Sequence, residues 1–205
     1  MDEKNIITFI LPTLGRNTLL NSLSSLYNLN NKNWNAIIIF DGIKNNFEIN
    51  DKRIKIIEIE KSGKEDIKNS AGLVRNIGFS YVDTEWIGFL DDDDYLSPDY
   101  IDYLINEITC IPNIDACIFR MGYENGTILP SKLDKNIIRN KVGISFAIKK
   151  YITQQVIFIN SPFEDYIFLK NIIKLKYKIV LSSYVAYFVR TYPYKCDIYP
   201  KLVLS

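Results

Sequence analysis

Residues 86–94 read WIGFLDDDD, an apolar run that ends in four consecutive aspartates. The run from Trp86 to Leu90 is short, strongly apolar and bounded by polar residues, which predicts a strand buried on both faces. The four carboxylates from Asp91 to Asp94 repel one another, so they need counter-charges, water or a cation. Hard divalent cations prefer oxygen ligands, so this turn is a candidate metal site. The alternative is a solvated acidic loop beside a helix that begins with Ser97 as its N-cap.

Apolar runs of the same kind recur on both sides of this strand and alternate with segments of helical periodicity. The expected strands cover residues 6–11, 36–40, 54–59, 116–119, 144–148, 179–181 and 185–189. The expected helices cover residues 17–29, 67–82 and 161–175, besides the one that begins at Ser97. This order predicts an α/β domain with a mainly parallel central sheet flanked by helices on both faces. We find no linker that would divide the chain, so one domain over 1–205 is expected.

Composition restricts the chemistry that this domain can use. The chain has 205 residues, 47% of them hydrophobic, with 25 Lys and Arg against 24 Asp and Glu. A net charge of +1 gives no general attraction for nucleic acid. The absence of histidine excludes Ser-His-Asp triads, histidine zinc sites and histidine general bases.

The cysteines and the amino-terminal residues predict a cytoplasmic protein. Cys110, Cys117 and Cys196 lack metal-site spacing and are expected to be reduced thiols. The first residues do not form a signal peptide, and no run is long enough to predict a membrane span.

Asp41, like the aspartates 91–94, lies at the carboxyl end of an expected strand, which is where ligands bind in parallel sheets. Asp41 ends the strand 36–40 and can accept hydrogen bonds from a base or ribose, or simply form a turn with Gly42. Arg75 lies in the helix before the aspartates. It could neutralise a phosphate, hold Asp41 in place, or be an ordinary surface arginine.

A second acidic pair follows at the start of the helix 161–175. Ser161 and Glu164 fit a capping box, which predicts a structural role for Glu164. Asp165 is not explained by that box. In a chain without histidine, it is a candidate general base.

Together these segments resemble the family 2 glycosyltransferases, which have the GT-A fold of nucleotide-diphospho-sugar transferases. The resemblance extends over nearly the whole chain. It rests on five segments in the same order: Phe9–Thr13, Phe40–Gly42, Gly72–Gly78, Phe89–Tyr100 and Phe163–Tyr166. The fourth segment is very similar to the one that carries the family's Asp-x-Asp motif.

The resemblance implies an inverting, metal-dependent transfer of one sugar from a nucleotide-sugar, most plausibly a UDP-sugar, to a hydroxyl of a glycan or other acceptor. It implies these roles: Pro12, Thr13, Asp41, Arg75, Asp91 and Asp92 bind the nucleotide-sugar, Asp93 holds Mn²⁺ or Mg²⁺, Glu164 lies on the acceptor side, and Asp165 is the base. Residues 1–99 would then form the nucleotide-sugar half and residues 100–205 the acceptor half.

The chain also departs from the family pattern. It has a single aspartate at position 41, no late histidine near the metal, and no Gln-x-x-Arg-Trp motif of the processive enzymes. The last absence favours addition of a single sugar. An alternative function is a degenerate module that binds a nucleotide or sugar without turning it over. A sugar nucleotidyltransferase would need a glycine-rich loop after the first strand, where 14–16 supplies one glycine.

Overall fold

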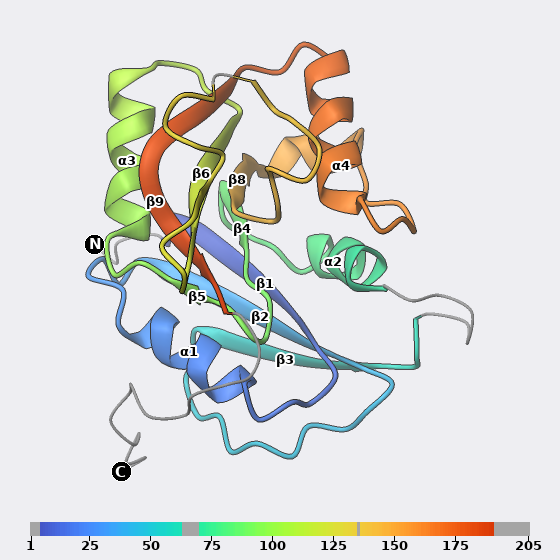
Figure 1. Cartoon of the computed structure of the whole chain (residues 1–205). Helices are drawn as coiled ribbons and strands as arrows, with labels where there is room; N and C mark the ends of the chain where they lie inside the picture. Colours follow the sequence, from blue (N-terminus) through green and yellow to red (C-terminus); the bar gives the residue numbers. More distant parts are fainter. Residues whose placement is uncertain (1–4, 63–69, 135, 191–205) are drawn as a thin grey trace.

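The computed structural model describes residues 5–62, 70–134 and 136–190. Within them, one sheet has the strand order β3-β2-β1-β4-β8-β6-β9-β5, and β7 pairs with β6 (Figure 1). The strands are β1 (Ile7–Thr13), β2 (Trp34–Asp41), β3 (Ile54–Ile59), β4 (Trp86–Phe89), β5 (Tyr95–Leu96), β6 (Ala116–Tyr123), β7 (Ile128–Leu129), β8 (Phe146–Lys149) and β9 (Ile179–Val189). The helices are α1 (Leu19–Tyr27), α2 (Ala71–Phe79), α3 (Tyr100–Cys110), η1 (Lys150–Gln154) and α4 (Glu164–Lys174).

The first half of the chain forms the parallel part of the sheet. Strand β1 pairs with β2 on one side and with β4 on the other, and β3 extends the sheet from β2. All seven residues of β1 and all four of β4 are buried, which explains their continuous apolar character. Since β1 is the strand at which the chain reverses its order of pairing, a crevice forms at its carboxyl end.

The second half adds mixed pairing. Strand β8 pairs antiparallel with β4 on one side and with β6 on the other, whereas β9 runs parallel to β6. The two predicted strands 179–181 and 185–189 are one strand, with register shifts opposite Ile118 and Arg120. Strand β5, which was not predicted, pairs with β9 and forms an edge of the sheet. The α/β class and helices on both faces are confirmed.

Two helices begin later than predicted. The N-cap of α3 is Asp99, and Ser97 instead accepts a hydrogen bond from the amide of Asp99 at 3.3 Å. The N-cap of α4 is Phe163, so Ser161 is not the capping residue. The Ser161 hydroxyl accepts the amide of Phe163 at 3.2 Å.

Some features expected from the sequence lie outside the described residues, whereas two cysteines and the helices can be compared with expectation. The start of the helix expected from residue 67 and the thiol of Cys196 lie outside the described residues. Cys110 and Cys117 are free thiols. Among the described helices, none has the length and apolar character needed to cross a membrane.

A cluster of phenylalanines joins α2 and α4 to one face of the sheet, while α1 and α3 cover the other (Figure 1). Its members are Phe79, Phe89, Phe146, Phe158 and Phe168. The side chain of Asn76 in α2 fixes the segment before α4. It donates to the carbonyl of Phe158 and accepts the amide of Phe158, each at 2.8 Å.

On the opposite face, Gly88 in β4 has no room for a side chain. A Cβ there would lie 2.7 Å from Cδ1 and Cε1 of Phe9, a buried ring that packs edge-on against Tyr100. We therefore expect Gly88→Ala to lower the free energy of unfolding by about 1–3 kcal/mol through overpacking. Urea denaturation would measure it. Leu133→Ala, at a side chain that is 90% exposed, is the control and should change stability by less than about 0.5 kcal/mol. Equal effects of the two variants would contradict the packing argument.

Candidate active site

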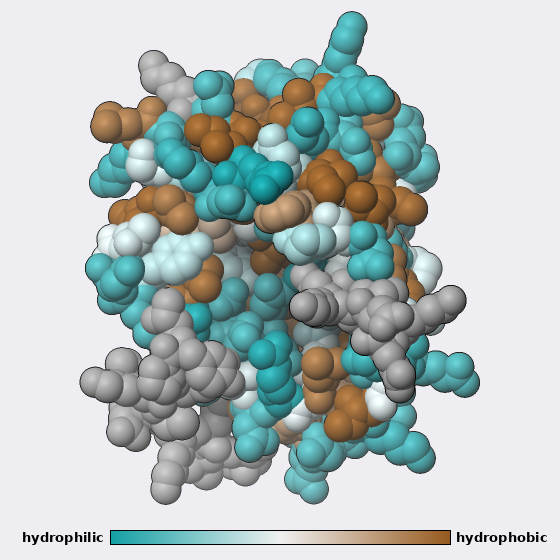
Figure 2. All heavy atoms as spheres, turned by 45° about the vertical axis from the view of Figure 1, so that its right-hand side comes forward, coloured by the Kyte–Doolittle hydropathy of each residue, from teal (hydrophilic) through white to brown (hydrophobic). Residues whose placement is uncertain are grey.

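A pocket of about 370 Å³ lies at the carboxyl ends of β1, β2 and β4, with α2 and the start of α4 on its other side. Hydrophilic side chains gather in the recessed middle of the face shown in Figure 2. The pocket brings together all the site residues predicted from sequence except Asp165: Pro12, Thr13, Asp41, Arg75, Asp91, Asp92, Asp93 and Glu164. Its described walls carry five carboxylates against three cations, Arg16, Lys61 and Arg75, and so a formal charge of −2.

Asp41 is a buried carboxylate at the end of β2, held by neighbouring residues. Its oxygens accept the amide of Ser62 at 2.6 Å and the hydroxyls of Ser62 and Ser70 at 3.0 and 2.9 Å, and Lys61 lies 3.3 Å away. Burial alone would raise the pKa of Asp41, but these hydrogen bonds and the Lys61 charge together hold it below its usual value. The prediction that Arg75 holds Asp41 in place is wrong, since these residues hold it instead.

Arg75 is the most buried cation of the described pocket wall, with 2% of its side chain exposed. It forms an ion pair with Asp91, lies 3.3 Å from the carboxylate of Glu164, and stacks above the ring of Phe158 at 5.5 Å. Burial opposes the charged form, but Asp91 and Glu164 outweigh it and raise the pKa of Arg75. A surface arginine is therefore excluded. Arg75 joins the turn after β4 to the first residue of α4.

Thr13 and Arg16 hold the middle of the acidic turn. Asp92 is 1% exposed and accepts the Thr13 hydroxyl at 2.7 Å. Arg16 binds Asp92 through two nitrogens, at 2.5 and 3.3 Å, and Asp93 through a third at 3.0 Å. Arg16 was not among the predicted site residues. Its position just after the first strand, at the edge where ligands bind, was the signal that could have found it.

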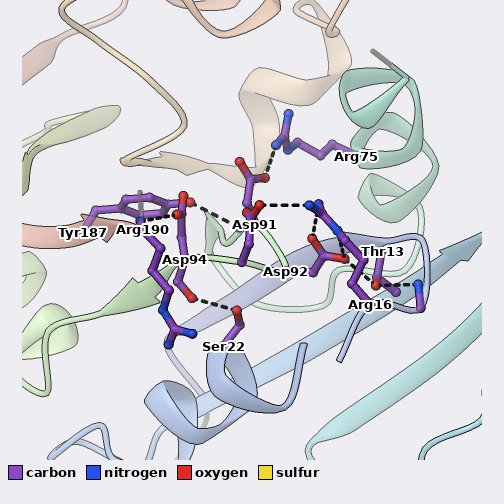
Figure 3. Close-up of polar contacts among 11 residues, drawn as sticks. Thr13, Arg16, Ser22, Arg75, Asp91, Asp92, Asp94, Tyr187 and Arg190 are labelled. Atoms are coloured by element: carbon purple, nitrogen blue, oxygen red, sulfur yellow. Dashed lines mark hydrogen bonds and ion pairs between the residues drawn. The ribbon is translucent and has the colours of Figure 1, made fainter. Parts of the chain in front are cut away.

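Asp94, the last residue of the acidic turn, is held by residues on the side away from Arg16, as Figure 3 shows. Its carboxylate accepts the amide of Arg190 at 3.0 Å and bonds to the hydroxyl of Tyr187, which also accepts the amide of Asp91 at 3.2 Å. The Ser22 hydroxyl donates to the Asp94 carbonyl at 2.7 Å. Burial and, next, the charge of Asp91 raise the pKa of Asp94 to about 8. The acidic turn is thus fixed by α1 and the end of β9 together.

Asp165 lies beside the pocket and is not part of its wall. One of its oxygens accepts the amide of Tyr166 at 2.6 Å. Burial raises the pKa of Asp165 to about 6, with Glu164 and Asp91 adding to the rise and the Tyr166 amide and Arg75 opposing it. A half-buried carboxylate with such a pKa is suited to accept a proton near neutral pH.

Asp91 and Asp93 are the carboxylates that fit a divalent cation. They are 35% and 29% exposed, on the pocket wall, and supply hard oxygen donors. The described residues contain no group of three or more His, Cys, Asp or Glu side chains that could hold a metal on their own. A cation here fits the magnesium pattern, in which one or two carboxylates share the ion with phosphates and water.

Tyr187 offers a direct test of how the acidic turn is held. Tyr187→Phe removes a buried hydroxyl that serves both Asp91 and Asp94, so we expect a loss of about 1–3 kcal/mol in the free energy of unfolding. Tyr184→Phe, on the same strand, is the matched control because its hydroxyl accepts an exposed hydrogen bond from Asn106 and serves neither aspartate. Chemical denaturation measures both variants. An unchanged stability of Tyr187→Phe would show that the hydroxyl does not fix the turn.

Comparisons with known proteins show what the domain as a whole resembles. The family model "Glycosyl transferase family 2" matches residues 8–168. The "Putative glycosyltransferase EpsH" of Bacillus subtilis (strain 168) is 29% identical over 110 residues, which are 50% of this chain and 30% of EpsH.

Among solved structures, S. aureus TarS 1-349 superimposes with a TM-score of 0.68 at 17% identity, over 90% of this chain and 60% of TarS 1-349. The same protein in complex with UDP-GlcNAc superimposes with a TM-score of 0.68 at 16% identity, over 95% of this chain and 62% of TarS 1-349. The mannosyltransferase PcManGT from Pyrobaculum calidifontis, in complex with GDP-Man and Mn²⁺, superimposes with a TM-score of 0.64 at 10% identity. The match covers 96% of this chain and 59% of PcManGT.

The chain thus spans less than two thirds of the length of each of these proteins. The structural likeness confirms the GT-A fold expected from the sequence. The family match extends from the second residue of β1 into α4 and includes every predicted site residue. The chain belongs to Glycosyl transferase family 2.

Proposed function

We propose that this domain transfers a single sugar from a nucleotide-sugar, with UDP as the nucleotide, to an acceptor hydroxyl, with inversion at the anomeric carbon. The observation that carries the proposal is the pocket itself. It places a low-pKa carboxylate, an acidic turn with two arginine partners and the start of α4 around one space at the switch point of the sheet. That space is large enough for a small ligand.

The nucleotide would occupy the side of the pocket formed by β1 and β2. Asp41 stays ionised and can accept an N–H of the base, while Pro12 and Thr13 line the same side. Two solved structures with this fold contain UDP and UDP-GlcNAc, which supports a uridine nucleotide, whereas a third contains GDP-Man.

Charge supports a divalent cation. A nucleoside diphosphate is an anion, and the described walls of the pocket already carry a formal charge of −2. Asp93, with Asp91 beside it, would hold Mn²⁺ or Mg²⁺. When bound, such an ion neutralises charge that develops on the departing diphosphate.

Asp165 would act from the acceptor side. It takes the proton of the acceptor hydroxyl while that oxygen forms a bond to the anomeric carbon. The bond from that carbon to the diphosphate breaks on the opposite face, and this single displacement inverts the configuration. Glu164 has a different proposed role, which is to hold Arg75 in place behind Asp91.

The first experiment measures calorimetric binding of UDP, GDP, CDP and dTDP with and without Mn²⁺. We expect UDP to bind selectively and at least tenfold more tightly with Mn²⁺, and Asp93→Asn to lose that gain. Asp102→Asn, an exposed residue in the first turn of α3, is the control. No binding of any nucleotide would contradict the proposal.

Asp165→Asn tests the base. General base catalysis contributes about 10²–10⁴-fold, so Mn²⁺-dependent cleavage of the donor should fall by at least about 100-fold while UDP affinity stays within twofold. Full activity of this variant would remove Asp165 from the mechanism. Nucleotide binding with no cleavage or transfer by the unaltered protein would favour a non-catalytic binding module.

The pKa of Asp165 predicts a pH profile. The base must be ionised, so the rate should be constant above pH 6 and fall about tenfold per unit below it. The residual rate of Asp165→Asn measured over the same range is the control and should lack the fall below pH 6. A rate that stays level down to pH 5 would be inconsistent with this role.

A further inference from the structure

Arg16 occupies a position that the proposed function leaves unexplained. It lies in the loop after β1 and reaches across to the turn after β4. Its guanidinium contacts two carboxylates at once: Asp92 through Nη2 and Nε, and Asp93 through Nη1. A cation therefore already lies against Asp93, the residue proposed to hold the metal.

The two halves of this contact differ in their surroundings. Asp92 is 1% exposed and is also fixed by the Thr13 hydroxyl, so it anchors Arg16 through a two-nitrogen contact. Asp93 is 29% exposed, Arg16 is 45% exposed, and a single nitrogen joins them. The contact with Asp93 is the one that can be exchanged while Arg16 stays attached to Asp92.

A guanidinium beside Asp93 and a divalent cation on Asp93 repel each other. We propose that Arg16 is a resident counter-ion that competes with the divalent cation for Asp93 until the diphosphate of a nucleotide offers the guanidinium another anion. This inference rests on the proposed function, because it assumes that Asp93 takes the metal and that the pocket takes a nucleoside diphosphate.

The consequence is cooperative binding. The diphosphate draws the guanidinium from Asp93 and so raises the affinity for metal, and linkage requires the metal to raise the affinity for nucleotide by the same factor. A cation alone must displace Arg16, so the free protein binds metal weakly. Arg16 thus delays loading of the metal until the donor is present.

The experiment titrates MnCl₂ into the protein alone and at saturating UDP, with bound Mn²⁺ followed by electron paramagnetic resonance. Without UDP, we expect Arg16→Gln to bind Mn²⁺ at least fivefold more tightly than the unaltered protein. We also expect the factor by which UDP increases the Mn²⁺ affinity to be at least fivefold smaller in this variant. Arg16→Lys keeps the positive charge but cannot span two carboxylates, so its Mn²⁺ affinity should lie between those of the unaltered protein and Arg16→Gln.

Arg53→Gln is the matched control. Arg53 also pairs with an aspartate, Asp51 at 2.6 Å, but it does not line the pocket, so both Mn²⁺ affinities should stay within twofold. One outcome would overturn the competition and leave the proposed function standing. In it, the unaltered protein binds Mn²⁺ in the presence of UDP, but folded Arg16→Gln binds Mn²⁺ without UDP no more tightly than the unaltered protein does. An unaltered protein that binds neither UDP nor Mn²⁺ would overturn both.

Discussion

Mutual repulsion among four carboxylates, placed directly after a buried strand, is the constraint on which this structure depends. The four aspartates of 91–94 have three sets of partners: Arg75 for Asp91, Arg16 for both Asp92 and Asp93, and the Tyr187 hydroxyl with the Arg190 amide for Asp94. These partners come from α2, the loop after β1, and β9 with the residue that follows it. The acidic turn therefore draws distant parts of the chain to one edge of the sheet.

One of these partners also connects the acidic turn to α4. Arg75 contacts Asp91 in the turn and Glu164 at the start of α4, next to Asp165. A buried guanidinium with only one of these carboxylates would be less well compensated. The paired amide contacts between Asn76, the next residue of α2, and Phe158 hold the segment before α4 to the same helix. The acidic turn and the start of α4 are thus held together by α2.

Much of the fold could be predicted because buried parallel strands are apolar along their whole length. β1, β2 and β4 are of this kind, and the predicted ranges matched them within a few residues. β5 could not be predicted, since two residues carry no periodicity and its existence depends on β9. The helix starts at Ser97 and Ser161 were predicted too early because both serines bond to nearby amides in turns instead.

The site was predictable in membership but not in its contacts. Eight predicted residues line one pocket because the carboxyl ends of parallel strands share an edge. Asp41 was wrong as a partner of Arg75, which contacts Asp91 and Glu164. The order of residues in the sequence does not say which nearby carboxylate a side chain reaches. Arg16 and Tyr187 were missed because their partners lie 77 and 96 positions away. Such contacts follow only from the strand order.

The pairing of β5 with β9 also bears on how the protein is made. A nascent chain that has just produced residues 91–96 lacks Tyr187 and Arg190, which it acquires only after some ninety further residues. Until then the acidic turn has neither its strand partner nor its full set of hydrogen bonds, and water must solvate it. The ribosome therefore releases the aspartates of the turn well before the strand that fixes them, and the site cannot mature until β9 has been made. A chain cut short before β9 would keep every residue of the pocket wall and still lose the turn's support.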